Sequence, residues 1–205
     1  MSFPMSFARA LAPVAIVAAA VATPAVAQTG DLARVQAHFS AVQSMTADFT
    51  QADARGRSSA GTLQLKRPGR VRFQYGSGDL LLVANGNRLT FVDYAVGQKN
   101  SWPLSRTPLG LLLSANPNLK SRAKIMPSDN PRVVVVRARD PAQYGTLLLA
   151  FVREASAPAG LKLYGWTAID AQNKRTTVKL SNQRYNVAVA ENAFTFAEPR
   201  KRASR

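Results

Sequence analysis

Apolar and polar residues alternate with a period of two along most of the chain, a pattern typical of half-buried β-strands. The clearest example runs from residue 61 to residue 75, where Leu63 and Leu65 share one face of the first half. The second half alternates in the same way. Pro68 lies between the halves and cannot donate a hydrogen bond to a ladder. The segment therefore predicts two antiparallel strands joined by a turn at 67–69.

Arg67 is the unusual residue of this hairpin, because its position follows Leu63 and Leu65 onto the apolar face. Two interpretations stay open. Strand pairing can end before Arg67, which leaves the side chain in solvent. Alternatively, Arg67 lies at the rim of an apolar chamber, where a guanidinium needs hydrogen-bond acceptors such as carbonyl oxygens.

The same alternation predicts about eleven strands in all. Besides the hairpin, the predicted strands are 45–51, 80–84, 88–94, 99–104, 122–126, 132–137, 146–152, 161–169, 176–184 and a last short strand at Phe194 and Phe196. Within 161–169, strict alternation places Leu163 and Ile169 on the face opposite Tyr164 and Trp166.

An amphipathic helix is predicted over 31–43, because apolar residues recur there at helical spacing. These residues are Leu32, Val35, Phe39 and Val42. Asp31 suits the N-cap or the first turn of this helix. His38, the single histidine of the chain, lies within it and is interpreted as a structural residue.

A second, short helix is predicted within 105–114. Thr107 can cap it, and Pro108 suits the first helical position. Its apolar face consists of Leu109, Leu112 and Leu113. The short length and Gly110 make the helix intrinsically weak, so it is stable only if its leucines dock on a partner surface. This behaviour is that of a lid, although an ordinary connecting helix has the same pattern.

These elements predict a single domain of the mainly β (α+β) class. Its antiparallel sheet is expected to curl, with helices covering the concave side. Several strands are apolar on both faces, which fits either a sheet that encloses helices and a ligand or an ordinary sandwich core.

Residues 1–27 are predicted to be a cleaved secretory signal peptide. Arg9 provides the positive n-region, 10–22 is an apolar run, and 25–27 is a small-x-small cleavage site. Removing 27 residues from the 205 leaves 178, which is about one domain. The chain contains no cysteine, so disulfides, thiolate metal sites and a lipid-modified N-terminal cysteine are excluded.

The formal net charge of +16 predicts attraction to anionic surfaces. A chain with an export signal is not expected to act on nucleic acid, whatever its charge. Catalytic motifs are missing from the sequence: we find no Gly-x-Ser-x-Gly elbow, no His-Glu-x-x-His motif and no phosphate-binding glycine loop. We therefore expect no enzyme activity, no cofactor and no metal site.

The ordered set of motifs resembles the outer-membrane lipoprotein carrier proteins of Gram-negative bacteria, the LolA family. The motifs are MTADFTQ at 45–51, GTLQLKRPGRVRF at 61–73, LLVANG at 81–86, an aromatic strand through Phe91 and Tyr94, TPL at 107–109, and FTF at 194–196 with Pro199 nearby. The resemblance covers most of the region 28–205, which it identifies as one LolA-like carrier domain. It implies an incomplete antiparallel β-barrel, lidded by short helices, around a hydrophobic cavity.

The resemblance also implies roles for individual residues. In the family, the arginine before the hairpin proline bonds to the lid-helix backbone and keeps the empty cavity shut, and Arg67 matches it. The lid helix matches Thr107, Pro108, Leu109, Leu112 and Leu113. Val71 and Phe73 match cavity residues, and the full candidate set for the acyl-chain cavity is Leu63, Leu65, Val71, Phe73, Phe49 and Phe91.

The implied function is that of a monomeric periplasmic chaperone without cofactor. Its implied partners are acylated lipoproteins as cargo, an inner-membrane lipoprotein-releasing ABC transporter, and a LolB-like outer-membrane acceptor lipoprotein where one is present. Three alternatives stay open: a carrier of the same fold that moves a free lipid or glycolipid, a basic envelope module that binds polysaccharide or anionic membrane, and a hydrolase.

Overall fold

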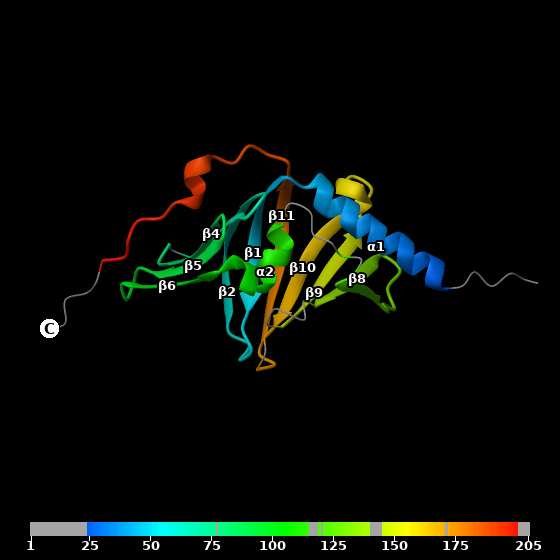
Figure 1. The fold of residues 1–205 in the computed structure, drawn as a ribbon, viewed down its shortest axis with the longest axis horizontal. Helices are drawn as coiled ribbons and strands as arrows, with labels where there is room; N and C mark the ends of the chain where they lie inside the picture. The colour runs from blue at the N-terminus through cyan, green and yellow to red at the C-terminus, as the bar shows by residue number, and fades with distance from the viewer. Residues whose placement is uncertain are drawn as a thin grey trace, which may run out of the picture.

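The computed structural model describes residues 24–76, 78–114, 119, 121–139, 145–170 and 172–200. In these residues, eleven antiparallel strands form one continuous sheet (Figure 1). The strands are β1 Ser44–Ala52, β2 Ser58–Lys66, β3 Arg70–Tyr75, β4 Leu80–Asn85, β5 Arg88–Asp93, β6 Gln98–Pro103, β7 Ala123–Met126, β8 Val133–Arg139, β9 Thr146–Arg153, β10 Leu161–Ile169 and β11 Arg175–Tyr185. Their order is β6-β5-β4-β3-β2-β1-β11-β10-β9-β8-β7, so β6 and β7 are the edges and the sheet stays open. The predicted mainly β class and incomplete barrel are confirmed.

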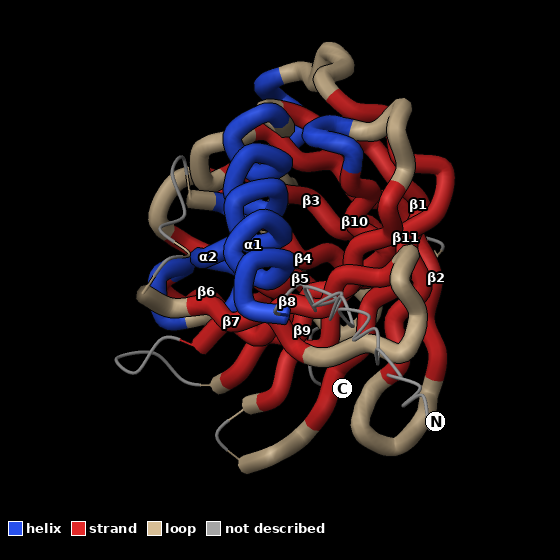
Figure 2. Tube along the Cα trace, turned by 90° about the vertical axis from the view of Figure 1, so that its right-hand side faces the viewer, coloured by secondary structure: helices blue, strands red, loops and turns tan. Residues whose placement is uncertain are grey.

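Two α-helices and three 3₁₀-helices accompany the sheet in the described residues. They are α1 Pro24–Ala41, α2 Pro108–Leu113, η1 Leu104–Arg106, η2 Pro158–Gly160 and η3 Glu191–Phe194. Figure 2 shows α1 crossing one side of the curled sheet, with α2 beside it. The contacts of α1 are with β7, β10 and η2. Both α-helices therefore lie on the concave side of the sheet.

Helix α1 begins earlier than the pattern predicts, so the interpretation of Asp31 as a cap is wrong. Asp31 lies inside the helix, where its carboxylate accepts hydrogen bonds from Arg153 of β9 at 2.7 and 2.8 Å. The apolar periodicity locates only the part of the helix that packs on the sheet. Residues 1–23 of the predicted signal peptide lie outside the described residues.

Trp166 lies on the opposite face of β10 from the one that strict alternation predicts. The register between β10 and β9 shifts between Leu163 and Gly165, so Tyr164 is an extra residue in the strand. A β-bulge of this kind reverses the facing of every residue that follows it. Tyr164 is accordingly 47% exposed, whereas Trp166 is 7% exposed and joins Leu163 on the concave side. Ile169 consequently lies on the outer face.

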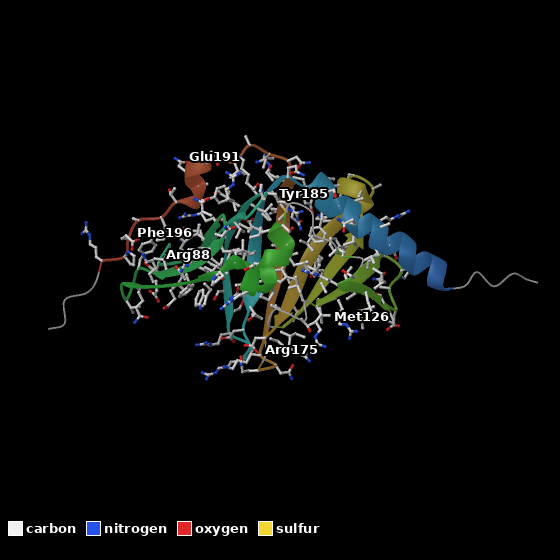
Figure 3. All side chains as sticks on the ribbon, viewed as in Figure 1. Arg88, Met126, Arg175, Tyr185, Glu191 and Phe196 are labelled. Carbon is white, nitrogen blue, oxygen red and sulfur yellow. The ribbon has the colours of Figure 1, made fainter. Side chains whose placement is uncertain are left out.

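The hydrophobic core has two parts, one on each face of the sheet. The large cluster fills the concave side between the sheet and the helices. The small cluster lies on the outer face of β4 and β5 and consists of Leu81, Val83, Val92, Val189 and Phe194. The last two residues belong to the C-terminal segment, which runs along this part of the molecule (Figure 3).

The predicted last strand at Phe194 and Phe196 is wrong. Phe194 ends η3, and the residues after it pair with no strand. The segment crosses the outer face of β3 and β4 instead of lying beside an edge, so side chains satisfy its backbone. The Arg72 guanidinium donates to the carbonyl oxygens of Ala193 and Thr195 at 3.2 and 2.9 Å.

We predict that Phe194→Ala lowers the free energy of unfolding by about 3–5 kcal/mol, because it empties a fully buried site. Phe194 is 1% exposed, although it lies outside the sheet. Phe196→Ala is the matched control, since Phe196 is only half-buried, and we expect a smaller loss. Urea unfolding of the two variants measures both values. Equal losses would show that the second cluster does not stabilise the fold.

Candidate functional site

A small apolar cavity lies between the concave side of the sheet and the two helices. Side chains from α1, β1, the β2–β3 hairpin, α2 and β10 line it: His38, Phe39, Val42, Met45, Leu63, Leu65, Arg67, Val71, Phe73, Leu109, Leu112, Leu113, Leu163 and Trp166. Its volume is about 30 Å³. That space holds little more than one water molecule. The structure is therefore a closed state, and any larger ligand requires the helices to move.

The hairpin supplies one wall of the cavity because its two strands pair in register. Leu63 faces Phe73, and Leu65 faces Val71. These are neighbouring cross-strand positions on the same face, so the four side chains form one apolar surface. This surface meets the leucines of α2, which cover it from the concave side.

Arg67 is 8% exposed and lines this cavity. Its Nη1 donates a hydrogen bond to the carbonyl oxygen of Phe39 in the last turn of α1, and its guanidinium stacks 4.9 Å from the Phe39 ring centroid. Its Nε is buried and has no hydrogen-bond partner among the described residues. Burial lowers the pKa of Arg67 to about 10, so the side chain still carries its charge at neutral pH. The structure thus selects the chamber interpretation of Arg67 over the solvent one.

The hydrogen bond of Arg67 goes to α1, not to the lid helix as the family resemblance implies. Helix α2 is tied to the hairpin by a different group. The backbone N–H of Gly69 donates to the carbonyl oxygen of Leu113, the last residue of α2, at 2.9 Å. Gly69 has φ of +70°, and a Cβ there would lie 2.9 Å from the carbonyl oxygen of Gly86. Only glycine therefore allows this turn to approach α2 and the β4–β5 turn together.

The start of α2 differs from the predicted cap. Thr107 occupies the N-cap position, but its hydroxyl donates back to the carbonyl oxygen of Leu104 at 2.8 Å and leaves the helix N–H groups without a side-chain cap. Gly110 has a packing role that the sequence did not reveal. A Cβ on Gly110 would lie 2.6 Å from the same carbonyl oxygen of Leu104. Gly110 thus weakens α2 by propensity but lets it pack closely against η1.

His38 is a cavity residue that the sequence interpretation treated only as structural. Its side chain is 2% exposed, and Nδ1 lies 3.0 Å from the carbonyl oxygen of Pro158 in η2. Its ring contacts Phe39, Phe151 and Tyr185 edge to face. Burial is the largest cause that lowers the pKa of His38 below 6.5, and the charge of Arg67 lowers it further, against the hydrogen bond to Pro158.

The structure separates the candidate cavity residues into two groups. Leu63, Leu65, Val71 and Phe73 line the cavity, as do Leu109, Leu112 and Leu113 of α2. Phe49 is buried in the same core and packs edge to face on Phe73 and Tyr75, outside the cavity lining. Phe91 is half-buried on β5 and also lies outside the lining.

Several lining residues were not predicted. Phe39 and Val42 had a signal, because both belong to the apolar stripe of the first helix. No sequence signal placed Leu163 and Trp166 on the same face, because the alternation of apolar and polar residues does not reveal the bulge between them. Among the described residues, no helix has the length and apolar character needed to span a membrane. Nor does that part of the chain contain three His, Cys, Asp or Glu side chains grouped to hold a metal ion.

The family model of the outer membrane lipoprotein carrier protein LolA matches residues 40–197. This match covers helix α2 and all eleven strands of the sheet. The chain belongs to the LolA family. Within this family, the outer-membrane lipoprotein carrier protein of Idiomarina loihiensis is 28% identical over 82% of this chain and 84% of its own length. That of Chromobacterium violaceum is 26% identical over 91% of each chain.

Solved structures also match. A LolA superfamily protein from Nitrosomonas europaea superimposes with a TM-score of 0.43 and 11% identity, over 82% of this chain and 98% of that chain. The MucA/MucB complex of Pseudomonas aeruginosa gives a TM-score of 0.48 and 14% identity, over 82% of this chain and 60% of the matched chain.

We predict that this LolA-family chain loses stability as the pH falls below 6.5. Because the pKa of His38 is lowered by folding, the unfolded state binds the proton first, and the free energy of unfolding falls by at most about 1.4 kcal/mol per pH unit. The loss of stability stops once the pH is below the pKa of His38 in the folded state. Urea unfolding between pH 7.5 and 5 measures the slope. Since His38 is the single histidine, His38→Phe should flatten the slope whatever its effect at pH 7.5. An unchanged slope would contradict the assignment.

We predict that Gly110→Ala destabilises the closed lid, despite the better helix propensity of alanine. The added Cβ meets the Leu104 carbonyl oxygen, so α2 must move, at a cost of about 1–3 kcal/mol. Binding of an apolar fluorescent dye should rise. Gly30→Ala is the control, because Gly30 lies in α1 with open space around its Cα and should gain up to about 1 kcal/mol. Equal gains in thermal stability for both variants would contradict the clash.

Proposed function

We propose that this chain is a periplasmic carrier, which binds the acyl chains of lipoproteins released from the inner membrane and delivers them to the outer membrane. Its family membership and the names of its relatives support a carrier role. The observation that carries the proposal is the apolar cavity, closed by the short leucine helix α2 and bordered by the buried Arg67.

The energetics of acyl chains support a closed container. Exposing an acyl chain to water costs about 0.8 kcal/mol per CH₂ group. Three chains of ordinary length therefore cost on the order of 30 kcal/mol in an aqueous compartment. The cavity can accept chains only by expanding, since its closed volume is about 30 Å³. Separation of α1 and α2 from the sheet would create that space without breaking any strand pairing.

The lid combines strong docking with weak intrinsic stability, which suits reversible binding. Helix α2 has six residues, far fewer than an isolated helix needs. Leu112 and Leu113 are buried, so the docked state depends on the apolar wall beneath them. Acyl chains can replace that contact with apolar contacts of their own. The exchange keeps the free-energy difference between the empty and loaded states small enough for release.

Arg67 contributes polarity to an otherwise apolar wall. In the closed state, its Nη1 ties the hairpin turn to α1 through the carbonyl oxygen of Phe39. This hydrogen bond forms only while α1 lies against the turn, so it favours the closed, empty state. We infer that the bond breaks when acyl chains enter and re-forms when the cargo leaves.

The transport route follows from this role. We propose that residues 1–27 direct export and are removed, and that 28–205 acts as a monomer in the periplasm without cofactor, ATP or enzyme activity of its own. An inner-membrane ABC transporter would supply the acylated lipoprotein. A LolB-like acceptor lipoprotein would receive it at the outer membrane where such an acceptor exists.

We predict that Arg67→Leu keeps cargo uptake but slows transfer from the carrier by roughly tenfold. The substitution removes a hydrogen bond that favours the closed empty state and adds an apolar contact to bound chains, together about 1.4 kcal/mol. Arg88→Leu is the control, because Arg88 is exposed on β5, away from the cavity (Figure 3). Transfer of labelled lipoprotein from each carrier to outer-membrane vesicles gives the rates. Normal transfer by the Arg67→Leu variant would contradict the proposed role of Arg67 in holding the empty carrier closed.

The carrier proposal itself is tested by adding the exported protein to spheroplasts. The expected result is acylated lipoprotein in the supernatant, bound to the carrier one to one. Co-purification of free lipid without lipoprotein would move the cargo assignment to a lipid or glycolipid. Absence of any acylated ligand would contradict the chamber function.

A further inference from the structure

Four cations form a compact square on the outer face of the sheet, at its β7 edge. Ala123 of β7 pairs with Ala138 of β8, and Lys124 pairs with Arg137. The residues one step before Ala123 and one step after Ala138 are Arg122 and Arg139, whose backbones are joined by a hydrogen bond of 2.8 Å. Two neighbouring cross-strand positions on the same face of the sheet are therefore occupied by like charges.

The square lies on the face opposite the cavity. Ala123 and Ala138 are buried in the concave core, whereas Arg122, Lys124, Arg137 and Arg139 are all exposed. Alternation along each strand places these four side chains on the outer face. They border a surface cleft of about 270 Å³, together with Ser121 and Thr146.

The Lys124–Arg137 pair is unfavourable without a counter-anion. Like charges directly opposite each other in an antiparallel pair destabilise it. Lys124, Arg137 and Arg139 form no ion pair with any described residue, whereas six other described cations do. No described acidic side chain lines the cleft, and Asp140, which follows Arg139, lies outside the described residues.

The outer face beside the square is apolar. Met126 pairs with Val135, two residues along each strand from the Lys124–Arg137 pair and on the same face, and Leu148 of β9 pairs with Arg137. All three apolar side chains are half-buried and lie outside both core clusters. A free phosphate ion needs only the cations. A lipid surface uses both parts, since cations contact headgroup phosphates while apolar side chains contact the acyl boundary.

A further cation extends this face beyond the square. Arg175 lies in the row of Arg139, because Arg139 pairs with Thr146, Thr146 with Ile169, and Ile169 with Arg175. Figure 3 shows Met126 and Arg175 in the lower half of the view, away from the C-terminal segment with Glu191 in the upper half. The basic surface is thus wide enough to contact several headgroups.

We propose that the outer face of β7 and β8 binds the phosphate groups of anionic phospholipids and holds this protein against a membrane surface. The site is separate from the cavity and goes beyond the carrier function. Lys124, Arg137 and Arg139 bind the headgroup phosphates, while Met126, Val135 and Leu148 rest on the upper acyl region.

The test is co-sedimentation of the exported, mature protein with vesicles of equal parts phosphatidylglycerol and phosphatidylcholine. A triple variant carries Lys124→Gln, Arg137→Gln and Arg139→Gln. Each cation near an anionic surface contributes about a factor of five, so we expect about a hundredfold weaker binding at low ionic strength. Vesicles of phosphatidylcholine alone should bind neither protein.

The matched control removes the same charge elsewhere, with Arg34→Gln, Arg88→Gln and Arg106→Gln, all at exposed residues. This control should bind nearly as tightly as the wild type. Equal losses in the two triple variants, or no binding by the wild type, would overturn the proposal. The unchanged thermal midpoint of each variant serves as the check on folding.

A second arm separates a lipid surface from a site for soluble phosphate. Met126→Ser should weaken vesicle binding, and inorganic phosphate should compete no better than chloride at the same ionic strength. Displacement by phosphate at matched ionic strength, with no effect of Met126→Ser, would assign the cleft to a free ion and overturn the membrane proposal. The vesicles contain no lipoprotein, so neither outcome bears on the carrier function.

Discussion

The three-residue turn 67–69 of the β2–β3 hairpin is the point on which the closed state depends. The Arg67 side chain donates to α1 at Phe39, and its backbone N–H donates to Gln43 at 2.8 Å. Gly69 donates to the end of α2 and accepts from Gly86 in the β4–β5 turn. One turn therefore connects both helices to the sheet. A ligand that enters the cavity must disturb these bonds, which couples loading to the position of both helices.

This coupling explains how the cavity stays closed at a volume of only about 30 Å³. The wall formed by Leu63, Leu65, Val71 and Phe73 needs an apolar partner, and the leucines of α2 provide one. Neither surface is polar, so the buried apolar area stabilises the closed state. The few hydrogen bonds at the turn fix the orientation of the helices. The two faces of the same sheet also differ in chemistry. The concave face is apolar around one charge, whereas the outer face near β7 is basic around a few apolar side chains.

Much of the fold was predictable because β-alternation and turn residues are local signals. Most strands were predicted within one or two residues of their observed bounds, α2 lies inside its predicted range, and β2 begins three residues before the predicted start. The last strand at Phe194 was not, because a strand requires a neighbour and the alternation does not say where the segment lies. The facing of the β10 residues after Tyr164 was predicted wrongly for a similar reason, since the sequence does not show that Tyr164 is an extra residue in the strand.

The sequence by itself determined the strand pairs that are close in the chain, the apolar face of the hairpin and the weakness of the lid, because each follows from residues a few positions apart. Tertiary structure alone decided the acceptor of Arg67, the burial of His38 and the place of Trp166 in the cavity. Each of these depends on the meeting of segments far apart in the chain. The geometry of such contacts comes from packing and register, which no local pattern encodes.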